Sequence, residues 1–393
     1  MKSLVFIVVL SVLFSCEYTA PASPEEADLL DGPIEGLTHA QQGQFLKGDI
    51  AFGEVFTKET GLGPLFVANQ CSACHAGDGK GTPFVSFFRF GQADTLGNTF
   101  LNQGGPQLQQ KALQGFSPEA LPAGASFTSL IAPAVTGLGY LDAVSDADLI
   151  ELADPDDVDG DGISGRPHWN NIPKYVTLRA DAIENQGRYI TRFGKKGGAY
   201  DLLHQSAGAY NQDMGIVSLL EPVDPYSGEA EDPEVSLNTL NDIVFYLKVL
   251  KAPIRRNENS TDVLAGEMLF QNIQCAACHV AEMKTATSPI AQLSNQTFHP
   301  YTDLLLHDMG EGLDDGYTEG FALTSEWKTP ALWGLGLSKD AQGGVYRLLH
   351  DGRATSISEA ILLHGGEALN SKNKYDALSE AEKKQLEAFL ESL

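Results

Sequence analysis

The segments Cys71-Ser72-Ala73-Cys74-His75 and Cys275-Ala276-Ala277-Cys278-His279 decide how this chain folds and what it can hold. Two cysteines three residues apart supply thiols for thioether bonds to haem vinyl groups, and the histidine that follows supplies an imidazole for the iron. A redox dithiol needs no such histidine, and a zinc site needs two more ligands nearby, which neither segment supplies. The two segments therefore predict two covalent haems, attached at Cys71, Cys74, Cys275 and Cys278, with His75 and His279 as proximal ligands.

The sequence around the two motifs also repeats. Gly266–Phe270 precedes the second motif much as Gly53–Phe56 and Gly63–Phe66 precede the first. Farther on, Ala132–Gly139 matches Thr329–Gly336, and both runs contain Pro-x-x-x-Gly-Leu-Gly. A long-range repeat of this kind indicates two copies of one structural plan. We expect a short helix leading into each cysteine loop.

Each half closes with a stretch whose apolar residues fall on one face of a helix. These residues are Ile243, Tyr246, Leu247 and Leu250 in the first half, and Leu386, Phe389, Leu390 and Leu393 in the second. The 40 glycines, the 19 prolines and the lack of sustained alternation predict few strands. We therefore predict a mainly α protein with long loops, made of two cytochrome c-like helical domains at 39–254 and 255–393, each carrying one covalent haem.

The N-terminal segment has the features of an export signal. Its apolar run, residues 4–14, is too short to span a bilayer. The run ends in Leu13-Phe14-Ser15-Cys16, which resembles the lipobox of bacterial lipoproteins. We expect a signal peptide at 1–15, lipidation of Cys16, and a solvated tether at 16–38 that anchors the protein in the periplasm or cell envelope. The alternative is an ordinary secretory signal, which also implies export.

Composition narrows the classes of partner. The chain has 393 residues, of which 42% are apolar, and a formal net charge of −26. Nucleic acid is an unsuitable partner, because phosphate binding depends on Lys and Arg. The acidic field favours a basic electron donor, such as a small cytochrome or copper protein. Five cysteines are too few for a disulfide scaffold of this size.

A run in the second half, His350–Gly366, resembles bacterial di-haem cytochrome c peroxidases, and more specifically the di-haem oxidoreductase family related to them. Gly61–Pro64, Asp303–Gly312, Ser325–Pro330 and the two Pro-x-x-x-Gly-Leu-Gly runs add to the resemblance. The resemblance implies an exported enzyme that takes electrons at the haem of His279. It would reduce hydrogen peroxide or another small oxidant at the haem of His75.

The resemblance also implies a second ligand for the haem of His279. In the peroxidases the methionine twelve residues after the glycine of the His-x-Gly run binds the iron of the electron-transfer haem. Here the same count from Gly352 reaches His364. We expect His279 and His364 to hold this iron together. The alternative is a hydrogen-bonded His364, with Met309 or Met283 as the ligand.

For the first haem, the resemblance points to a segment that carries a distal glutamine and a glutamate. Asp201-Leu202-Leu203-His204-Gln205 matches its start, and Asp213-Met214 stands where Glu-Met is expected. Gln205 would position the peroxide, and Asp213 would move a proton between its two oxygens. The resemblance does not decide the sixth ligand of this iron. The position is vacant, or it is filled by His168, His204 or Met214.

A third kind of site is suggested by the run Asp157-Val158-Asp159-Gly160-Asp161-Gly162. Alternating carboxylates followed by a glycine suit calcium, with Asp157, Asp159 and Asp161 as ligands. The twelfth position holds His168 instead of the glutamate of an EF-hand, so an acidic surface turn is the alternative.

Two other functions fit the same haem chemistry. One is an electron-transfer cytochrome in which both irons are six-coordinate and nothing is turned over. The other is a di-haem enzyme that oxidises residues of a partner protein at a distance. Access to the first iron separates these possibilities.

Overall fold

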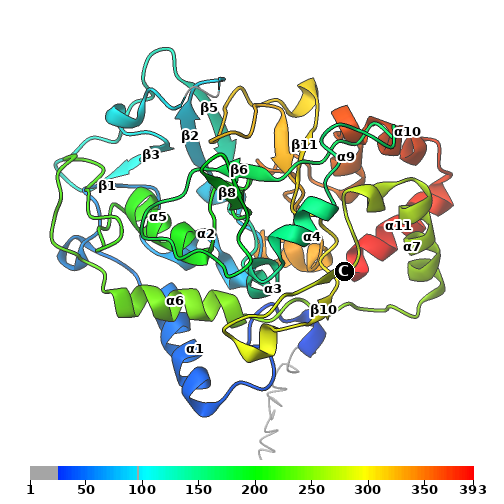
Figure 1. Ribbon diagram of the computed structural model, residues 1–393, viewed down its shortest axis with the longest axis horizontal. Helices are drawn as coiled ribbons and strands as arrows, with labels where there is room; N and C mark the ends of the chain where they lie inside the picture. The colour runs from blue at the N-terminus through cyan, green and yellow to red at the C-terminus, as the bar shows by residue number, and fades with distance from the viewer. Residues whose placement is uncertain (1–24, 95–96) are drawn as a thin grey trace, which may run out of the picture.

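The computed structural model of the chain describes residues 25–94 and 97–393 (Figure 1). The predicted signal peptide, Cys16 and the first part of the tether lie outside these residues. Within the described part, no helix is both long enough and apolar enough to cross a membrane.

Helical turns of all kinds account for 35% of the described residues. The α-helices are α1 His39–Phe52, α2 Cys71–Cys74, α3 Leu138–Asp142, α4 Asp146–Glu151, α5 Leu202–Met214, α6 Leu237–Val249, α7 Thr261–Asn272, α8 Ser338–Ala341, α9 Ile357–Leu362, α10 Leu369–Asp376 and α11 Glu380–Ser392. In Figure 1, α1, α5 and α6 lie on one side of the molecule and α7, α9, α10 and α11 on the other.

Strands and isolated bridge residues together account for 13% of the described residues, and the strands are all short. They are β1 Leu65–Phe66, β2 Phe87–Gly91, β3 Gln107–Leu108, β4 Lys111–Ala112, β5 Ser126–Leu130, β6 His168–Asn170, β7 Glu184–Asn185, β8 Arg188–Thr191, β9 Met283–Lys284, β10 Thr297–Phe298, β11 Leu306–Asp308 and β12 Glu326–Lys328. They pair, all antiparallel, as β1-β4, β3-β2-β5, β6-β8-β7, β10-β9 and β11-β12.

These small sheets qualify the prediction of a mainly α protein. Helices are the larger share of the regular structure, but the long loops are extensively paired with one another. Pairs of two or three residues are too short to show an alternating pattern in the sequence, which is why they were not foreseen.

Each half is built on a pair of crossing helices. α1 packs on α6 in the first half, and α7 packs on α11 in the second. A side chain on Gly48 would overlap the carbonyl oxygen of Asp242, and one on Gly266 would overlap that of Gln385. Both crossings therefore require a glycine where the two backbones meet. The amphipathic stretches predicted to close each half are these helices, α6 and α11.

The two Pro-x-x-x-Gly-Leu-Gly runs also have the same place in the two halves. A Cβ on Gly139 would overlap the carbonyl oxygen of Lys248 near the end of α6, and one on Gly336 would overlap that of Glu391 near the end of α11. Each run thus packs its last glycine against the closing helix of its own half. The predicted repeat is a repeat of structure as well as of sequence.

One part of the predicted repeat is wrong. Gly53–Phe56 is not a helix, because α1 ends at Phe52 and Gly53 is its C-cap. The counterpart of Gly266–Phe270 is Gly48–Phe52, the last turn and a half of α1. The 18 residues between Phe52 and Cys71, against four between Phe270 and Cys275, hid this relationship.

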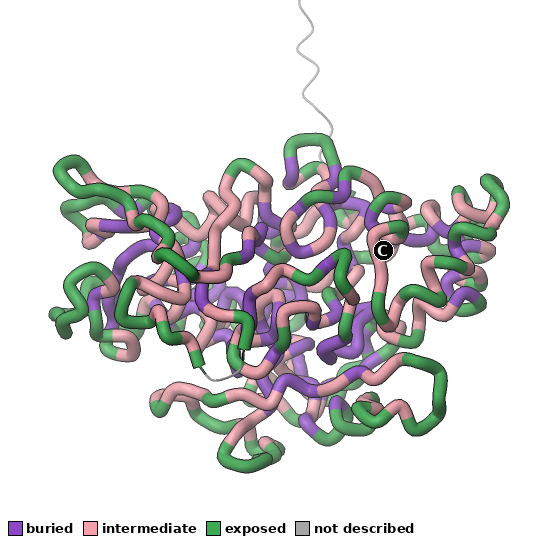
Figure 2. Tube along the Cα trace, turned by 90° about the horizontal axis from the view of Figure 1, so that it is seen from above, coloured by how far each residue is buried: buried purple, intermediate pink, exposed green. Residues whose placement is uncertain are grey.

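Apolar contacts join the two halves. One cluster of buried side chains combines Leu141, Val144, Leu149 and Ile190 of the first half with Met283, Phe298, Leu304 and Trp333 of the second. Figure 2 shows the buried segments gathered in the interior and the exposed ones around them. Burial of this apolar surface holds the two halves in one orientation.

Candidate functional site

The two cysteine motifs open onto one cavity of about 580 Å³. Its wall includes all four motif cysteines, both motif histidines and His364. Gln205 and Asp213 also line it, so the structure brings together every predicted haem and catalytic residue.

The first motif is held by α2 and the residue after it. The backbone N–H of His75 donates to the carbonyl of Cys71 over 3.0 Å. Nδ1 of His75 lies 2.8 Å from the carbonyl oxygen of Pro133, so this nitrogen carries the proton and donates it. Burial lowers the pKa of His75 to about 4, which keeps the ring neutral. Its Nε2 lone pair is therefore available on the cavity side.

The second motif has the same arrangement. The backbone N–H of His279 donates to the carbonyl of Cys275 over 3.0 Å, and its Nδ1 donates to the carbonyl of Tyr301 over 3.0 Å. Burial lowers the pKa of His279 to about 4. A neutral imidazole fixed through Nδ1 is the form in which histidine binds a metal through Nε2.

The four thiols are unsuited to redox dithiol chemistry. Burial raises the pKa of Cys71, Cys74 and Cys275 to about 12, and also raises that of Cys278. Reactive cysteines have lowered pKa values, because the thiolate is the nucleophile. The thiols fit covalent attachment of a cofactor better than exchange with a disulfide.

His364 follows α9 and repeats the pattern of the motif histidines. Its Nδ1 donates to the carbonyl of Ala360 over 2.7 Å, and burial lowers its pKa. His364 lines the same cavity as His279 and, after burial, contributes to lowering the pKa of His279. The competitor Met309 lines the cavity as well, but it packs against a cluster of apolar side chains that includes Trp327. Met283 does not line the cavity.

Gln205 and Asp213 both come from α5. The side chain of Asp201 accepts the backbone N–H of His204 and caps the start of this helix, and Gly215 ends it with φ +64°. Burial raises the pKa of Asp213 to about 6, although Arg89 opposes the rise. The carboxyl group of Asp213 can therefore change its protonation state near neutral pH.

Two charged residues on the cavity wall were missed by the sequence analysis. Arg89 on β2 and Glu319, in the loop between β11 and β12, form an ion pair at 3.6 Å. A Cβ placed on Gly194 would lie 3.8 Å from both Gln205 Oε1 and Glu319 Oε1. Glu319 therefore stands beside Gln205, although it belongs to the second half of the chain. No local pattern marks it, because Arg89 is 230 positions away.

The candidates for the sixth position of the first iron are not equivalent. Nδ1 of His168 donates to the carbonyl of Lys196 and its Nε2 accepts the N–H of Phe321, so both nitrogens are engaged. His204 lines the cavity, but its Nδ1 accepts the N–H of Tyr200, which puts the proton on Nε2. Of these three candidates, Met214 lines the cavity with a ligand atom, its sulfur, for which no hydrogen bond is found among the described residues.

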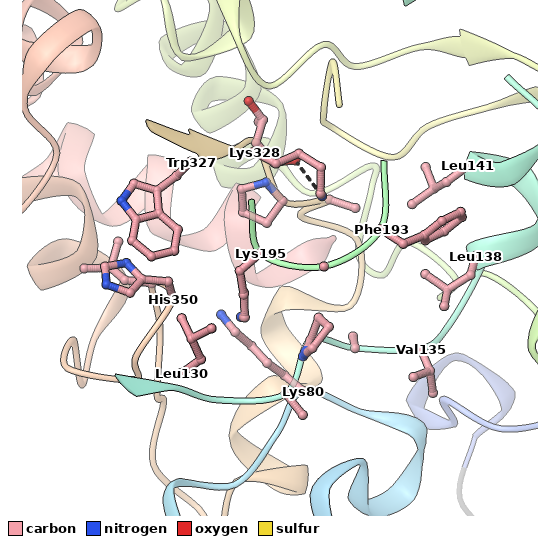
Figure 3. A pocket seen from close by; sticks show the side chains of 18 of the residues that line it. Lys80, Leu130, Val135, Leu138, Leu141, Phe193, Lys195, Trp327, Lys328 and His350 are labelled. Atoms are coloured by element: carbon pink, nitrogen blue, oxygen red, sulfur yellow. Dashed lines mark hydrogen bonds between the residues drawn. The ribbon is translucent and has the colours of Figure 1, made fainter. Parts of the chain in front are cut away.

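Three lysines meet in the cavity. Figure 3 shows Lys80 and Lys195 pointing toward one another, with Trp327 and His350 to one side and Val135, Leu138 and Phe193 to the other. Lys80, Lys195 and Lys328 form no ion pair with any described carboxylate. Burial lowers the pKa of Lys80 and Lys328 to about 8 and that of Lys195 further, since its two neighbours repel its charge.

Lysines this deeply placed need an anionic partner. The cavity is lined by two cysteine–histidine motifs, and haem carries two propionate groups. The lysines would supply the positive charge that such carboxylates need, so the residues present fit two haems.

The second motif is braced by a charged histidine. His307 lies 2.8 Å from Asp303, 2.6 Å from Glu367 and 3.6 Å from Cys278 Sγ. Burial opposes its charge, but these groups raise the pKa of His307 to about 12. A cation that uses both ring nitrogens cannot bind iron, so His307 has a structural role.

The predicted calcium loop is assembled only in part. Asp157 and Asp159 come together with Asp154, which the sequence analysis did not single out. Asp161 is not part of this group, and its carboxylate accepts the N–H of Ile163 over 2.8 Å. Asp154, Asp157 and Asp159 accept backbone N–H groups too. These bonds shape an acidic turn, and calcium binding there stays a prediction.

Comparison with known proteins identifies a family. The sequence model of the family described as "Di-haem oxidoreductase, putative peroxidase" matches residues 126–393. The matched region contains the second motif, α5 and Glu319, but neither the first motif nor Arg89. No curated protein matches the sequence.

Two solved structures illustrate how distant the structural similarities are. Hydrazine synthase of Kuenenia stuttgartiensis has a TM-score of 0.36 and 13% identity, over 98% of this chain and 100% of that chain. A MauG-like protein associated with microbial copper homeostasis has a TM-score of 0.41 and 12% identity, over 93% and 92%. Neither similarity is strong enough to carry an argument about this chain.

Proposed function

This chain belongs to the di-haem oxidoreductase family, and from that premise we propose that it is a c-type di-haem enzyme that reduces hydrogen peroxide or a similar small oxidant. The observation that carries the proposal is the contrast between the two motifs. The second motif shares the cavity wall with another buried imidazole, His364, whose pKa is lowered by burial. Around the first motif, α5 and Glu319 supply a glutamine and two carboxyl groups instead.

The chain would hold each haem in the same way. Cys71 and Cys74, and likewise Cys275 and Cys278, would form thioether bonds, and His75 and His279 would bind iron through Nε2. The two haems, when bound, supply electron transfer and the reduction of the oxidant. Lys80, Lys195 and Lys328 would neutralise the propionates in the middle of the cavity.

Proton handling at the first site falls to the chain. Breaking an O–O bond requires a group that takes a proton from one oxygen and delivers it to the other. The Asp213 carboxylate suits this role, because its pKa of about 6 lets it accept and release a proton near neutral pH. The amide of Gln205 would hold the oxidant by hydrogen bonds. Glu319, beside it, provides a second carboxylate.

At the second site the side chains favour electron transfer over substrate binding. His364 and His279 are both fixed through Nδ1 to backbone carbonyls, at 2.7 and 3.0 Å. If both imidazoles hold the same haem iron, that iron would transfer electrons without binding a substrate. We assign electron entry to this site.

The setting of the enzyme is part of the proposal. The features of residues 1–16 support export and a lipid anchor at Cys16, in the periplasm or cell envelope. The net charge of −26 supports a basic electron donor, such as a small cytochrome or copper protein. A calcium ion at Asp157 and Asp159 would bind the Oδ2 atoms of these residues, since their Oδ1 atoms accept the backbone N–H groups.

The test is turnover of the purified di-haem protein with hydrogen peroxide and a reduced small cytochrome. The proposal predicts oxidation of the cytochrome that depends on peroxide. If the protein is reduced and oxidised reversibly but never consumes peroxide, it is an electron-transfer cytochrome. If it consumes peroxide only when a partner protein is present and that partner becomes oxidised, it is a protein-modifying enzyme.

A further inference from the structure

A second, smaller hollow of about 180 Å³ lies against the cavity. Two residues, Arg89 and Glu319, line both spaces. The remaining wall comes from two groups of residues, Gln92, Asp94, Gly97, Asn98, Leu101 and Pro106 after β2, and Tyr317, Thr318 and Gly320 in the second half. The Arg89–Glu319 ion pair is therefore a partition between the hollow and the cavity.

The hollow is lined by both polar and apolar groups. Gln92, Asn98, Tyr317 and Thr318 line it together with the ion pair, and Leu101 and Pro106 add apolar surface. Its volume suits a few water-sized molecules and is far below that of a haem. A wall of this kind fits a small molecule that forms hydrogen bonds.

The loop that carries Glu319 is fixed to the first half. The N–H of Thr318 donates to the carbonyl of Gln92 over 3.1 Å, and its hydroxyl donates to that of Ala93 over 2.9 Å. On the cavity side a Cβ on Gly198 would overlap Glu319 Oε1, so Gly198 makes room for the carboxylate. The partition therefore has a set position beside Gln205.

The ion pair itself is not closed by a hydrogen bond. The two charged groups are 3.6 Å apart, which is longer than a hydrogen bond, and the side chains are 23% and 14% exposed. The guanidinium of Arg89 stays charged, because Glu319, Tyr317 and Asp213 outweigh the effect of burial and raise its pKa.

We propose that this hollow is the entrance to the first haem site for a small, neutral, hydrogen-bonding oxidant, with the Arg89–Glu319 pair as its inner gate. This inference rests on the proposed function. A molecule that passes between the two side chains arrives at Gln205. The carboxylates of Asp94 and Glu319 in the hollow outnumber the one guanidinium of Arg89, so the hollow gives an anion no net attraction and does not oppose a neutral molecule.

The test is to cover the mouth of the hollow without touching the site. Leu101 lines the hollow and is 58% exposed, so Leu101→Trp adds an indole at the rim. Leu219 is 62% exposed and lines neither space, so Leu219→Trp is the matched control. Both di-haem proteins are mixed with cyanide, which enters as neutral hydrogen cyanide. The association and dissociation rates at the first haem are then measured by stopped-flow in the oxidised and half-reduced states.

An entrance predicts that Leu101→Trp slows association and dissociation by the same factor, roughly tenfold, and leaves the equilibrium affinity unchanged. Leu219→Trp should match the parent protein, and Leu101→Ala should be as fast or faster. Equal rates in Leu101→Trp and Leu219→Trp overturn the entrance alone. A weaker affinity with unchanged dissociation also overturns it, since that pattern marks damage to the site. Absence of any cyanide binding in the parent protein contradicts the proposed function and the entrance together.

Discussion

The two halves of this molecule share one framework and differ in what faces the cavity. In both, a helix with an essential glycine crosses the closing helix, and a neutral histidine presents Nε2 to the cavity. Around the second motif the cavity wall carries His364. Around the first it carries Gln205 and Asp213 of the first half and Glu319 of the second. The framework thus fixes where a haem can bind, and a handful of facing residues determine what each haem can do.

The largest effect should come from removing one attachment site at a time. Cys71→Ala/Cys74→Ala and Cys275→Ala/Cys278→Ala should each lower the haem content from two to one per chain. The first should abolish both peroxide turnover and cyanide binding, because it removes the reactive site. The second should abolish turnover but keep cyanide binding. Haem content by pyridine haemochrome and optical titration measure both, and loss of cyanide binding in the second variant would reverse the assignment of the two sites.

The proton-transfer residue should give the next largest effect. Asp213→Asn should lower kcat/KM for peroxide by about 10²–10⁴-fold, the usual contribution of a general acid or base. In the parent protein the rate should rise as the pH increases through about 6, since the raised pKa of Asp213 keeps it protonated below that value.

Asp213→Asn should lose that limb of the pH profile, and Asp213→Glu should restore much of the activity. A profile with the same limb in Asp213→Asn would mean that another group, such as Glu319, carries the proton.

The charged brace of the second motif should affect stability instead of turnover. His307→Gln leaves two buried carboxylates unpaired and should cost about 3–5 kcal/mol. His299→Gln, at an exposed histidine, should cost almost nothing. Thermal or denaturant unfolding of the two variants makes the comparison.

The ion pairs of His307 also make the stability of the folded protein depend on pH. The pKa of His307 is raised from 6.5 to about 12, so its stabilising effect is complete below pH 6.5 and is lost as the pH rises toward 12. The pKa of Glu367 is lowered from 4.5 to about 2, so its effect is complete above pH 4.5 and is lost as the pH falls toward 2. His307→Gln should remove the alkaline decline, and an unchanged decline would show that His307 is not charged.

The smallest effects test the shared framework. Gly48→Ala and Gly266→Ala each push a methyl group into the backbone of the closing helix and should cost about 1–3 kcal/mol, by similar amounts. Gly43→Ala in the same helix as Gly48 meets no atom within 4 Å and should be neutral or stabilising. A large cost in one half alone would show that the two crossings are not equivalent.

The sequence predicted what is local. The motifs and the closing helices α6 and α11 each depend on residues within one turn or two of each other. The repeat was recognisable from the Pro-x-x-x-Gly-Leu-Gly runs, because a glycine is required wherever a backbone carbonyl comes this close.

What the sequence did not predict depends on distant partners. The Arg89–Glu319 pair joins residues 230 positions apart, and the three cavity lysines come from three separate segments. Neither has a spacing that a pattern could detect. The match between Gly48–Phe52 and Gly266–Phe270 was missed for a related reason. The long stretch between Phe52 and Cys71 puts Gly48 much farther from its cysteine motif than Gly266 is from the second.

The central claim is that the first haem site is open and the second is closed by His364, and cyanide stoichiometry tests it most directly. The parent protein should bind one cyanide per two haems, in the oxidised or half-reduced state, and His364→Ala should bind two. Binding of two cyanides by the parent, or of none, would contradict the account.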